Sequence, residues 1–263
     1  MSGKTVRFGR FFGQGRNLAL VAVDHGAEFG PLPGLTNVPA TLEKLACADG
    51  LLLNPGLLRD SEAFFGRPNS PALIVRLTWT TSYCFPWGYK EGHTCSVTTA
   101  SKAVAMGADL VMACCNLQSG DEAVDRDNVA LFADIAAEAN DIGVPIIGEV
   151  YPADAENLPE AKLHESVLRQ SRMVAELGAD AIKTFYTGER FAEVVEGAGV
   201  PILVLGASKT DEIGALEKAH EAISAGARGV VFGRNVFQAS DPVKFLSALA
   251  KVVHKEATPK EVF

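Results

Sequence analysis

The stretch VAELGADAIKTFY, residues 174–186, joins the end of a predicted helix to a predicted strand through Gly178. A glycine just after a helix readily takes the left-handed conformation that ends it, and the apolar run that follows has the length of a strand. The same phrase recurs as AVAMGADLVMACC (103–115), ANDIGVPIIGEVY (139–151), VEGAGVPILVLG (195–206) and ISAGARGVVFGRN (223–235). The chain is therefore predicted to consist of repeated helix–strand units.

Three earlier apolar runs, at residues 18–26, 49–54 and 72–78, bring the total to about eight strands, most of them separated by helical segments. Continuous apolar runs are typical of parallel strands covered on both faces. Eight such units in a chain of this length predict an α/β fold, a (β/α)8 TIM barrel. An open doubly wound sheet is the alternative, but the first strand leads into DHGAEFGPLPG, which lacks the dinucleotide-binding GxGxxG pattern.

No linker-like or low-complexity stretch interrupts residues 20–250, so we expect residues 1–263 to form a single barrel domain. The predicted helix at residues 240–256 would close the barrel, and residues 257–263 read as a loose tail. The first residues lack the apolar core of a signal peptide, and no later run is long enough to span a bilayer.

Composition limits the classes of partner. The formal net charge of −8 argues against a nucleic-acid or anionic-membrane surface, although a local pocket can still bind a small anion. The five cysteines form no CxxC pair and read as reduced thiols, which predicts a cytoplasmic protein. His93 and Cys95 lack a second pair of ligands, so we expect no metal and no other cofactor.

Polar residues gather where the predicted strands end, which is the active-site rim of a TIM barrel. Because strand side chains alternate, Lys183 should point into the barrel mouth, as should Glu149 and Tyr151. The rim residues are Asp24, His25, Arg76, Glu149, Tyr151, Lys183, Gly206, Gly233, Arg234 and Asn235.

Lys183 is the unusual residue among them, because a buried ammonium is costly unless it is paired, deprotonated or reached by water. An edge strand from which the lysine reaches solvent is one explanation. In a barrel mouth, the lysine would be either a nucleophile that forms a Schiff base with a carbonyl compound or a fixed cation that holds a carboxylate or phosphate. The residues alone leave both roles open.

The last two strand ends, LGASK (205–209) and FGRN (232–235), combine glycine with small or polar residues before a helix. Exposed backbone N–H groups in such loops bind phosphate well, and this is the usual phosphate site of the architecture. The sequence therefore predicts a phosphate site, to which Lys209 could add charge. Its predicted residues are Gly206, Ala207, Ser208, Gly233 and Arg234, with His25 and Arg76 as further substrate-binding residues.

Five segments together resemble the archaeal-type class I fructose-bisphosphate aldolases and their bacterial relatives, within the superfamily of DeoC- and LacD-like aldolases. They are VAVDHGAEFGPLPGL, GEVYP, LGADAIKTFYTG, VPILVLGASKT and GARGVVFGRNVFQASDP. The resemblance implies that Lys183 is the Schiff-base lysine, Tyr151 the proton donor and acceptor, and Asp24 a carboxylate beside the iminium. It also implies a homo-oligomer built from rings of barrels, such as a decamer.

The sequence departs from the family in three places. Glu149 stands where the hexose-bisphosphate aldolases usually carry tryptophan, and Gly206-Ala207 replaces a pair of glycines. The segment at residues 76–96 is longer and more aromatic than the family pattern. It either reshapes the substrate pocket or is a surface loop whose aromatic side chains pack locally. The aromatic side chains and histidine concerned are Trp79, Tyr83, Trp87, Tyr89 and His93.

Taken together with these observations, the resemblance implies a metal-independent lyase of carbohydrate metabolism that cleaves or forms a C–C bond in a phosphorylated ketose. Lys183 would attack the ketone, and Tyr151 would take the proton from the C4 hydroxyl with help from Glu149 or Asp24. The second hypothesis is a transferase on the same scaffold, either a thiolase that uses coenzyme A or a transaldolase-like synthase. The third is a non-catalytic phosphosugar-binding protein in which Lys183 is a counter-ion.

Overall fold

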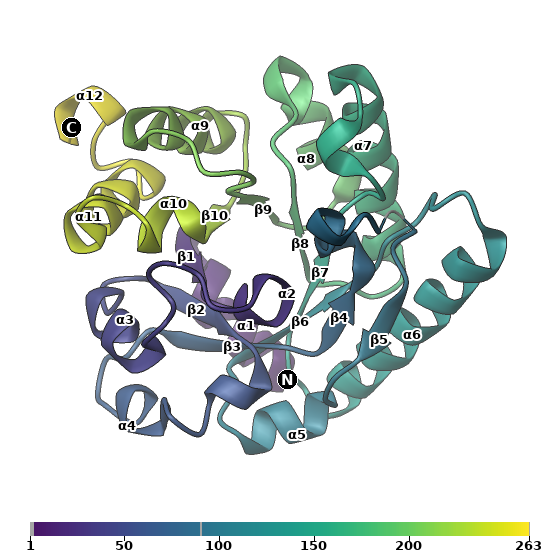
Figure 1. The fold of residues 1–263 in the computed structure, drawn as a ribbon, viewed down its shortest axis with the longest axis horizontal. Coiled ribbons are helices and arrows are strands. Elements are labelled where there is room, and N and C mark those ends of the chain that lie inside the picture. The colour runs from purple at the N-terminus through teal and green to yellow at the C-terminus, as the bar shows by residue number, and fades with distance from the viewer. Residues whose placement is uncertain (1–2, 90, 263) are drawn as a thin grey trace.

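A closed barrel of eight parallel strands forms the centre of the computed structural model, which describes residues 3–89 and 91–262. The strands follow one another around the barrel in chain order, and β1 pairs with β10 to close it (Figure 1). This confirms the predicted TIM barrel. The barrel strands are β1 (Leu18–Ala22), β2 (Gly50–Leu53), β3 (Ala72–Arg76), β6 (Leu110–Cys114), β7 (Ile146–Glu149), β8 (Ala181–Thr184), β9 (Ile202–Leu205) and β10 (Gly229–Phe232).

Helices surround the barrel, and several begin at a side chain that caps their first N–H groups. Asp121 accepts hydrogen bonds at the start of α6, Asp211 at the start of α9 and Asp241 at the start of α11. The main helices are α3 (Val38–Lys44), α4 (Glu62–Phe65), α5 (Ala100–Ala105), α6 (Glu122–Asp141), α7 (Glu160–Glu176), α8 (Phe191–Ala198), α9 (Glu212–Ser224) and α11 (Pro242–Val253).

Shorter elements lie in the loops between strands and helices. The α-helical turns are α2 (Gly26–Phe29) and α10 (Arg234–Phe237), and the antiparallel hairpin consists of β4 (Thr78–Thr80) and β5 (Thr94–Ser96). The 3-10 turns are η1 (Gly13–Gly15), η2 (Pro55–Leu57), η3 (Thr81–Tyr83), η4 (Phe85–Trp87), η5 (Ala155–Asn157) and η6 (Gly188–Arg190). Among the residues that the structure describes, no helix has the length and apolar character needed to cross a membrane.

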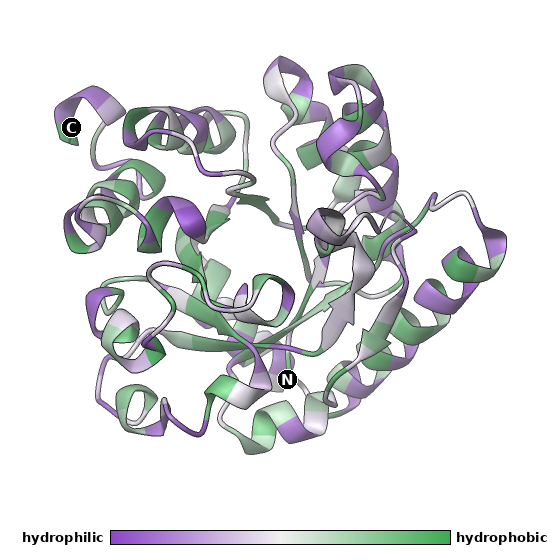
Figure 2. Ribbon diagram, in the orientation of Figure 1, coloured by the Kyte–Doolittle hydropathy of each residue, from purple (hydrophilic) through white to green (hydrophobic). Residues whose placement is uncertain are grey.

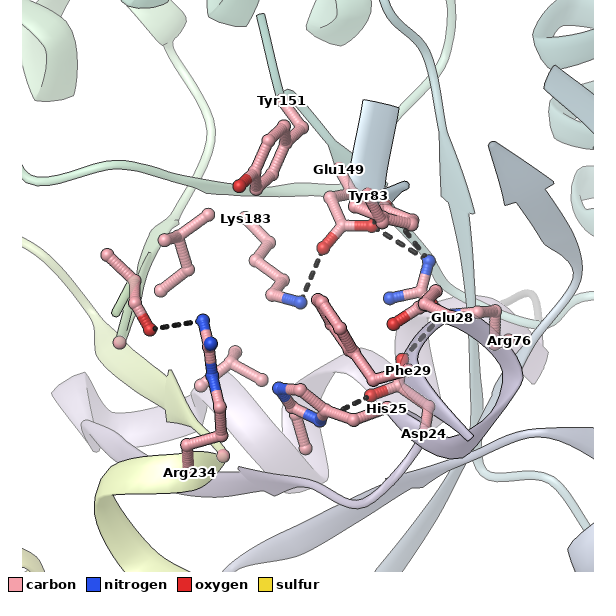
Figure 3. A pocket seen from close by; sticks show the side chains of 16 residues that line it. Asp24, His25, Glu28, Phe29, Arg76, Tyr83, Glu149, Tyr151, Lys183 and Arg234 are labelled. Carbon is pink, nitrogen blue, oxygen red and sulfur yellow. Dashed lines mark hydrogen bonds and ion pairs between the residues drawn. The ribbon is translucent and has the colours of Figure 1, made fainter. Parts of the chain in front are cut away.

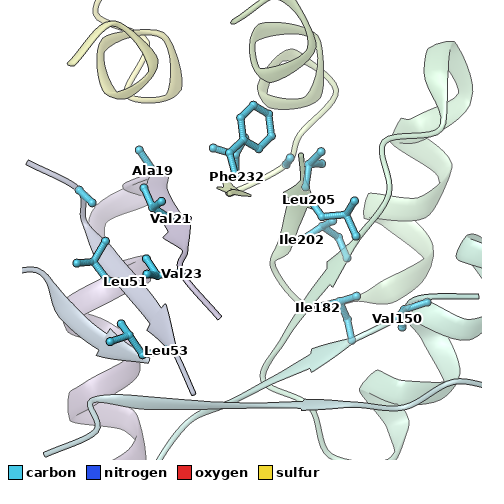
Figure 4. Close-up of a cluster of buried hydrophobic side chains, with 14 of the residues drawn as sticks. Ala19, Val21, Val23, Leu51, Leu53, Val150, Ile182, Ile202, Leu205 and Phe232 are labelled. Carbon is cyan, nitrogen blue, oxygen red and sulfur yellow. The ribbon is translucent and has the colours of Figure 1, made fainter. Parts of the chain in front are cut away.

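Two apolar layers follow from the alternation of strand side chains. The outer layer lies between strands and helices and includes Val21, Ile182 and Phe232 (Figure 4). The inner layer fills the barrel and includes Leu20 and Ala181. In Figure 2 the strands are mostly hydrophobic, whereas the helices carry both hydrophobic and hydrophilic residues. Since Ala181 points inward and Ile182 outward, the next residue of β8 points inward too, as predicted.

The N-terminal helix α1 (Gly3–Phe12) closes the bottom of the barrel, a feature that the sequence analysis did not predict. Phe8, Phe11 and Phe12 pack against the inner apolar layer. The guanidinium of Arg228 lies 6.0 Å from the centre of the Phe12 ring and donates to the Phe12 carbonyl. These three rings cover apolar surface that would otherwise be open to water.

The expectation of a loose C-terminal tail is wrong for the residues described. α12 (Pro259–Val262) packs beside α9 and α11, and Pro259 is buried. Glu261 accepts hydrogen bonds from both the backbone N–H and the hydroxyl of Thr258, which fixes the start of this turn. Phe263 lies outside the described residues. The predicted helix at 240–256 is α11, which packs against β1 where the barrel closes.

Candidate active site

A cavity of about 560 Å³, including space open to solvent, lies at the C-terminal mouth of the barrel. All the predicted catalytic and substrate-binding residues line it except Ser208, which is exposed. The Ser208 hydroxyl lies 3.5 Å from Glu156 instead. The predicted residues that line the cavity are Asp24, His25, Arg76, Glu149, Tyr151, Lys183, Gly206, Ala207, Gly233 and Arg234.

Lys183 lies on β8, the sixth strand of the barrel, and its side chain points into the mouth (Figure 3). The residue is only 6% exposed. Its neighbour across the β7–β8 pair is Glu149, and the Lys183 amine donates a hydrogen bond to that carboxylate. The ion pair supplies a buried partner for the ammonium, so the explanation by an exposed edge strand is wrong.

Arg76 connects the two buried carboxylates of the mouth. Its Nε donates to Asp24 at 2.5 Å and its Nη1 donates to Glu149 at 2.8 Å. Burial alone would raise the pKa of both carboxyl groups, but the charges of Arg76 and Lys183 outweigh burial and lower the pKa of each. Asp24 and Glu149 are therefore ionised at neutral pH.

Tyr83 completes this network, although the sequence analysis assigned it only to the aromatic segment. The side chain comes from η3, and its hydroxyl donates to Glu149. The centre of its ring lies 5.1 Å from Cζ of the Arg76 guanidinium, and the ring packs edge-on against Tyr151. Glu149 is consequently held by three side chains, which fixes its carboxylate beside the Lys183 amine.

Among the described residues of the segment at positions 79–95, Tyr83 is the only one that lines the cavity. Trp79 packs on Trp87 and donates its indole N–H to the Ala27 carbonyl at 3.1 Å. Trp87 and Tyr89 are about half exposed, and His93 pairs with Glu91. Among the described residues of this segment, the local-packing alternative holds for all the aromatic side chains named above except Tyr83.

Tyr151 lies beside Tyr83, just beyond the end of β7, and its hydroxyl donates to Glu156 at 3.0 Å. Burial and the neighbouring Glu156 carboxylate raise the pKa of Tyr151, so it is a neutral phenol in the resting site. Its ring packs against Phe185, which fixes its orientation. A phenol bonded to a carboxylate can pass its proton to that carboxylate as it accepts another.

The loops that follow β9 and β10 line another side of the cavity. Arg234 donates from Nη2 to the Ala207 carbonyl at 3.1 Å, and its guanidinium lies 5.5 Å from the centre of the Phe29 ring. Its buried Nε has no hydrogen-bond partner within the described part of the chain. Asn235 ties the loops together, because its amide donates to the Gly206 carbonyl at 3.1 Å and accepts from Thr210 N–H at 2.9 Å.

Gly233 is required by close packing against His25. A Cβ at this position would lie 2.2 Å from Cε1 of His25 and 3.0 Å from the Ala22 carbonyl, so only glycine fits. Burial lowers the pKa of His25 to about 4, with the charges of Lys183 and Arg234 acting in the same direction. The imidazole is therefore uncharged at neutral pH.

Glu28 and Phe29 are cavity residues that the sequence analysis missed. Both lie on the short turn α2, which directly follows Asp24 and His25. Glu28 is only 5% exposed, and its Oε1 has no hydrogen-bond partner among the described residues. Burial, reinforced by the Asp24 charge, raises the pKa of Glu28 to about 8. Within residues 3–89 and 91–262, no three His, Cys, Asp or Glu side chains are placed so that together they could hold a metal ion.

Comparison with known proteins identifies the family. The model of the DeoC/LacD family aldolases matches residues 18–239. An uncharacterized aldolase of Saccharolobus solfataricus is 36% identical over 98% of this chain and 96% of its own length. The 2-amino-3,7-dideoxy-D-threo-hept-6-ulosonate synthase of Halobacterium salinarum is 32% identical over 98% of this chain and 94% of its own.

Solved structures agree with this assignment. An archaeal fructose 1,6-bisphosphate aldolase superposes with a TM-score of 0.80 at 30% identity, covering 95% of this chain and 99% of that one. A second, whose catalytic lysine is covalently bound to the carbinolamine intermediate of the substrate, has a TM-score of 0.78 at 27% identity with the same coverage. The chain belongs to the DeoC/LacD aldolase family, whose members are lyases that act through a Schiff base.

Proposed function

We propose that this enzyme cleaves or forms a C–C bond in a phosphorylated ketose, with Lys183 as the Schiff-base lysine. The observation that carries the proposal is the buried Lys183 amine inside the barrel mouth, bonded to a carboxylate and facing a cavity with phosphate-binding features. A fixed counter-ion would not require Glu149 and Tyr151 beside it. Proton acceptors and donors beside an amine are what imine chemistry requires.

The first step is attack on the ketone. Glu149 takes a proton from Lys183, and the neutral amine adds to the carbonyl carbon to give a carbinolamine. Glu149 then returns a proton to the carbinolamine hydroxyl, which leaves as water, and the nitrogen lone pair forms the iminium. The contacts of Glu149 with Arg76 and Tyr83 support this role, because they keep the carboxylate in place through both transfers.

The second step is cleavage of the bond between C3 and C4. Tyr151 accepts the proton of the C4 hydroxyl while passing its own to Glu156, and the C3–C4 electrons move into the iminium to give an enamine. The aldehyde leaves, Tyr151 donates its proton to C3 of the enamine while Glu156 returns the proton it holds to Tyr151, and water releases the ketone product. The ionised Asp24 offsets the positive charge of the iminium.

The phosphate would lie against Arg234, Gly206, Ala207 and Gly233. The unpartnered Nε of Arg234 and the small residues of the two loops support this assignment. Ser208 is not included, since its side chain lies outside the cavity. A single domain over residues 1–263, a homo-oligomer and a cytoplasmic location also remain predictions.

The test is a product screen by mass spectrometry. The enzyme is incubated with dihydroxyacetone phosphate and a panel of aldehydes, with and without a chelator, and each product is identified by mass. We expect at least one ketose phosphate whose formation survives the chelator and is lost in Lys183→Ala. Turnover that persists in Lys183→Ala, or that the chelator abolishes, would contradict the proposal.

A synthase is the second candidate, favoured by the 32% identity to the Halobacterium salinarum synthase over nearly the whole chain. In such an enzyme the enamine formed on Lys183 would be passed to an acceptor other than a simple aldehyde. Adding candidate acceptors, including coenzyme A, to the same screen distinguishes the two. A transfer product formed faster than any ketose phosphate would favour the synthase.

A further inference from the structure

The cavity has two chemically different ends on either side of the Lys183 amine. Figure 3 shows Arg234 on one side, and Glu28 and Arg76 on the other. At the first end, the buried Nε of Arg234 has no hydrogen-bond partner among the described residues. The hydrogen bond that Arg234 does make goes to a backbone carbonyl and not to a carboxylate. The second end combines three carboxyl groups with one arginine, so we refer to it as the acidic end (Asp24, Glu28, Glu149, Arg76 and Tyr83).

The cations at the acidic end are already neutralised. Arg76 is bonded to both Asp24 and Glu149, and Lys183 is bonded to Glu149. Within the part of the chain that the structure describes, Arg234 is therefore the one arginine or lysine of the cavity lining without a carboxylate partner. His25 adds no charge at neutral pH, because burial keeps its pKa near 4.

We propose that the substrate carries a single phosphate, bound at the Arg234 end, and that its other half is uncharged and hydroxylated, with the Glu28 carboxyl hydrogen-bonded to one of its oxygens. This inference rests on the proposed function, since it assigns the two halves of the ketose to the two ends. It distinguishes this chain from the similar structures named fructose 1,6-bisphosphate aldolases, whose substrate has a phosphate at each end.

Electrostatics oppose a second phosphate at the acidic end. The group would be moved from water into a site where ionised Asp24 and Glu149 already engage Arg76. Burying a doubly charged anion without an unpaired cation costs more than burying a hydroxyl, which needs only hydrogen bonds.

Glu28 has the features of a hydroxyl-binding group. Its buried Oε1 lacks a partner, which is costly in the empty site and is relieved when a substrate oxygen bonds there. The titratable and charged groups that interact electrostatically with Glu28 are Asp24, Arg76, Glu149, Lys183 and the thiols of Cys84 and Cys114. With its pKa near 8, the carboxyl carries a proton at neutral pH and can donate it in a hydrogen bond.

The experiment is borohydride trapping on the full-length enzyme with matched ketoses. Fructose 1-phosphate and tagatose 1-phosphate are compared with their 1,6-bisphosphates, and the concentration giving half-maximal adduct is read by intact mass. Dihydroxyacetone phosphate is the reference, because it lacks the C4–C6 half that the inference assigns to the acidic end. We expect at least one monophosphate to trap at about tenfold lower concentration than its bisphosphate.

Equal or better trapping of the bisphosphates, or no trapping of either monophosphate, would overturn the inference. If dihydroxyacetone phosphate still forms its adduct in that case, the proposed Schiff-base function survives. If it forms none, the proposed function fails as well.

Glu28→Gln tests the named contact, since glutamine keeps a donor but cannot ionise. The quantity compared is the half-maximal concentration of the monophosphate divided by that of dihydroxyacetone phosphate. In the parent enzyme this ratio should rise about tenfold from pH 7 to pH 9, because Glu28 loses its proton. The ratio should stay constant in Glu28→Gln and rise as in the parent in Glu62→Gln, which alters an exposed acid. The same rise in Glu28→Gln would contradict the role of Glu28. The comparison of monophosphates with bisphosphates uses the parent enzyme and does not depend on this variant.

Discussion

The bottom and the mouth of the barrel are filled by residues of the same strands but in opposite ways. At the bottom, Leu18, Leu20 and Leu203 meet the phenylalanines of α1 in an apolar plug. On β7 and β8 the inward-facing Ile147 and Ala181 belong to the same apolar layer, and the next inward-facing residues, at the mouth, are Glu149 and Lys183. The bottom gains stability by excluding water from apolar surface, whereas the mouth holds several buried charges that are costly unless they are paired.

The difference shows how one fold separates stability from chemistry. The mouth tolerates its charges because each carboxylate has a cationic partner, and the network has a stable scaffold because the lower layers are apolar. Variants at the mouth should therefore change the rate, and variants at the bottom should change the free energy of unfolding.

The largest expected effect after loss of Lys183 itself is that of Glu149→Gln. The amide keeps the shape of the side chain but cannot accept the Lys183 proton, so kcat should fall about 10³-fold while the protein stays folded. Steady-state kinetics and circular dichroism measure the two properties. Glu217→Gln changes an exposed acid and should leave both unchanged. A kcat within a few-fold of the parent would remove Glu149 from the mechanism.

Phe12→Ala tests the bottom. Phe12 is nearly buried and packs against Phe8 and Arg228, so its truncation should lower the free energy of unfolding by about 3 kcal/mol. The kinetic constants of the remaining folded enzyme should be unchanged. Denaturant unfolding gives the energy, and Val6→Ala, at an exposed position on the same helix, is the control. A rate loss without destabilisation would show that bottom and mouth are not independent.

The sequence was sufficient to predict the mouth better than the bottom. The glycine-terminated apolar runs predicted the strands, and alternation along β8 placed Lys183 inside the barrel, because both follow from local periodicity. The apolar plug was not predicted, because the sequence alone does not show that the phenylalanines of α1 cover the inner layer of the barrel. The prediction of a loose tail was wrong for residues 257–262 because α12, with the buried Pro259, packs on α9 as well as on the preceding helix α11, and a contact with α9 cannot be inferred from the local sequence.

Glu28 was missed for a different reason. An acid on a short turn after a strand is normally solvated, and no sequence pattern shows that α2 folds over the cavity. The pairing of Glu149 with both Arg76 and Lys183 was likewise beyond prediction, because it depends on the register between neighbouring strands and on the length of each side chain.

Arg234→Ala should have the smallest effect of the set. Loss of the guanidinium should raise the KM for a phosphorylated substrate about 10- to 100-fold and leave that for dihydroxyacetone nearly unchanged. Lys209→Ala is the control, because Lys209, which the sequence suggested as a further charge for the phosphate site, lies outside the cavity lining with its amine bonded to the Gln238 carbonyl. Equal increases for both substrates would show that Arg234 supports the loops and does not bind phosphate.

The most direct test of the account is the site of the covalent adduct. The enzyme is reduced with borohydride in the presence of dihydroxyacetone phosphate, digested, and sequenced by mass spectrometry. The account predicts one substrate-derived adduct, on Lys183 within AIKTFY, that is absent from Lys183→Ala. An adduct on another lysine, or no adduct under conditions where the enzyme turns over, would contradict a Schiff base at Lys183.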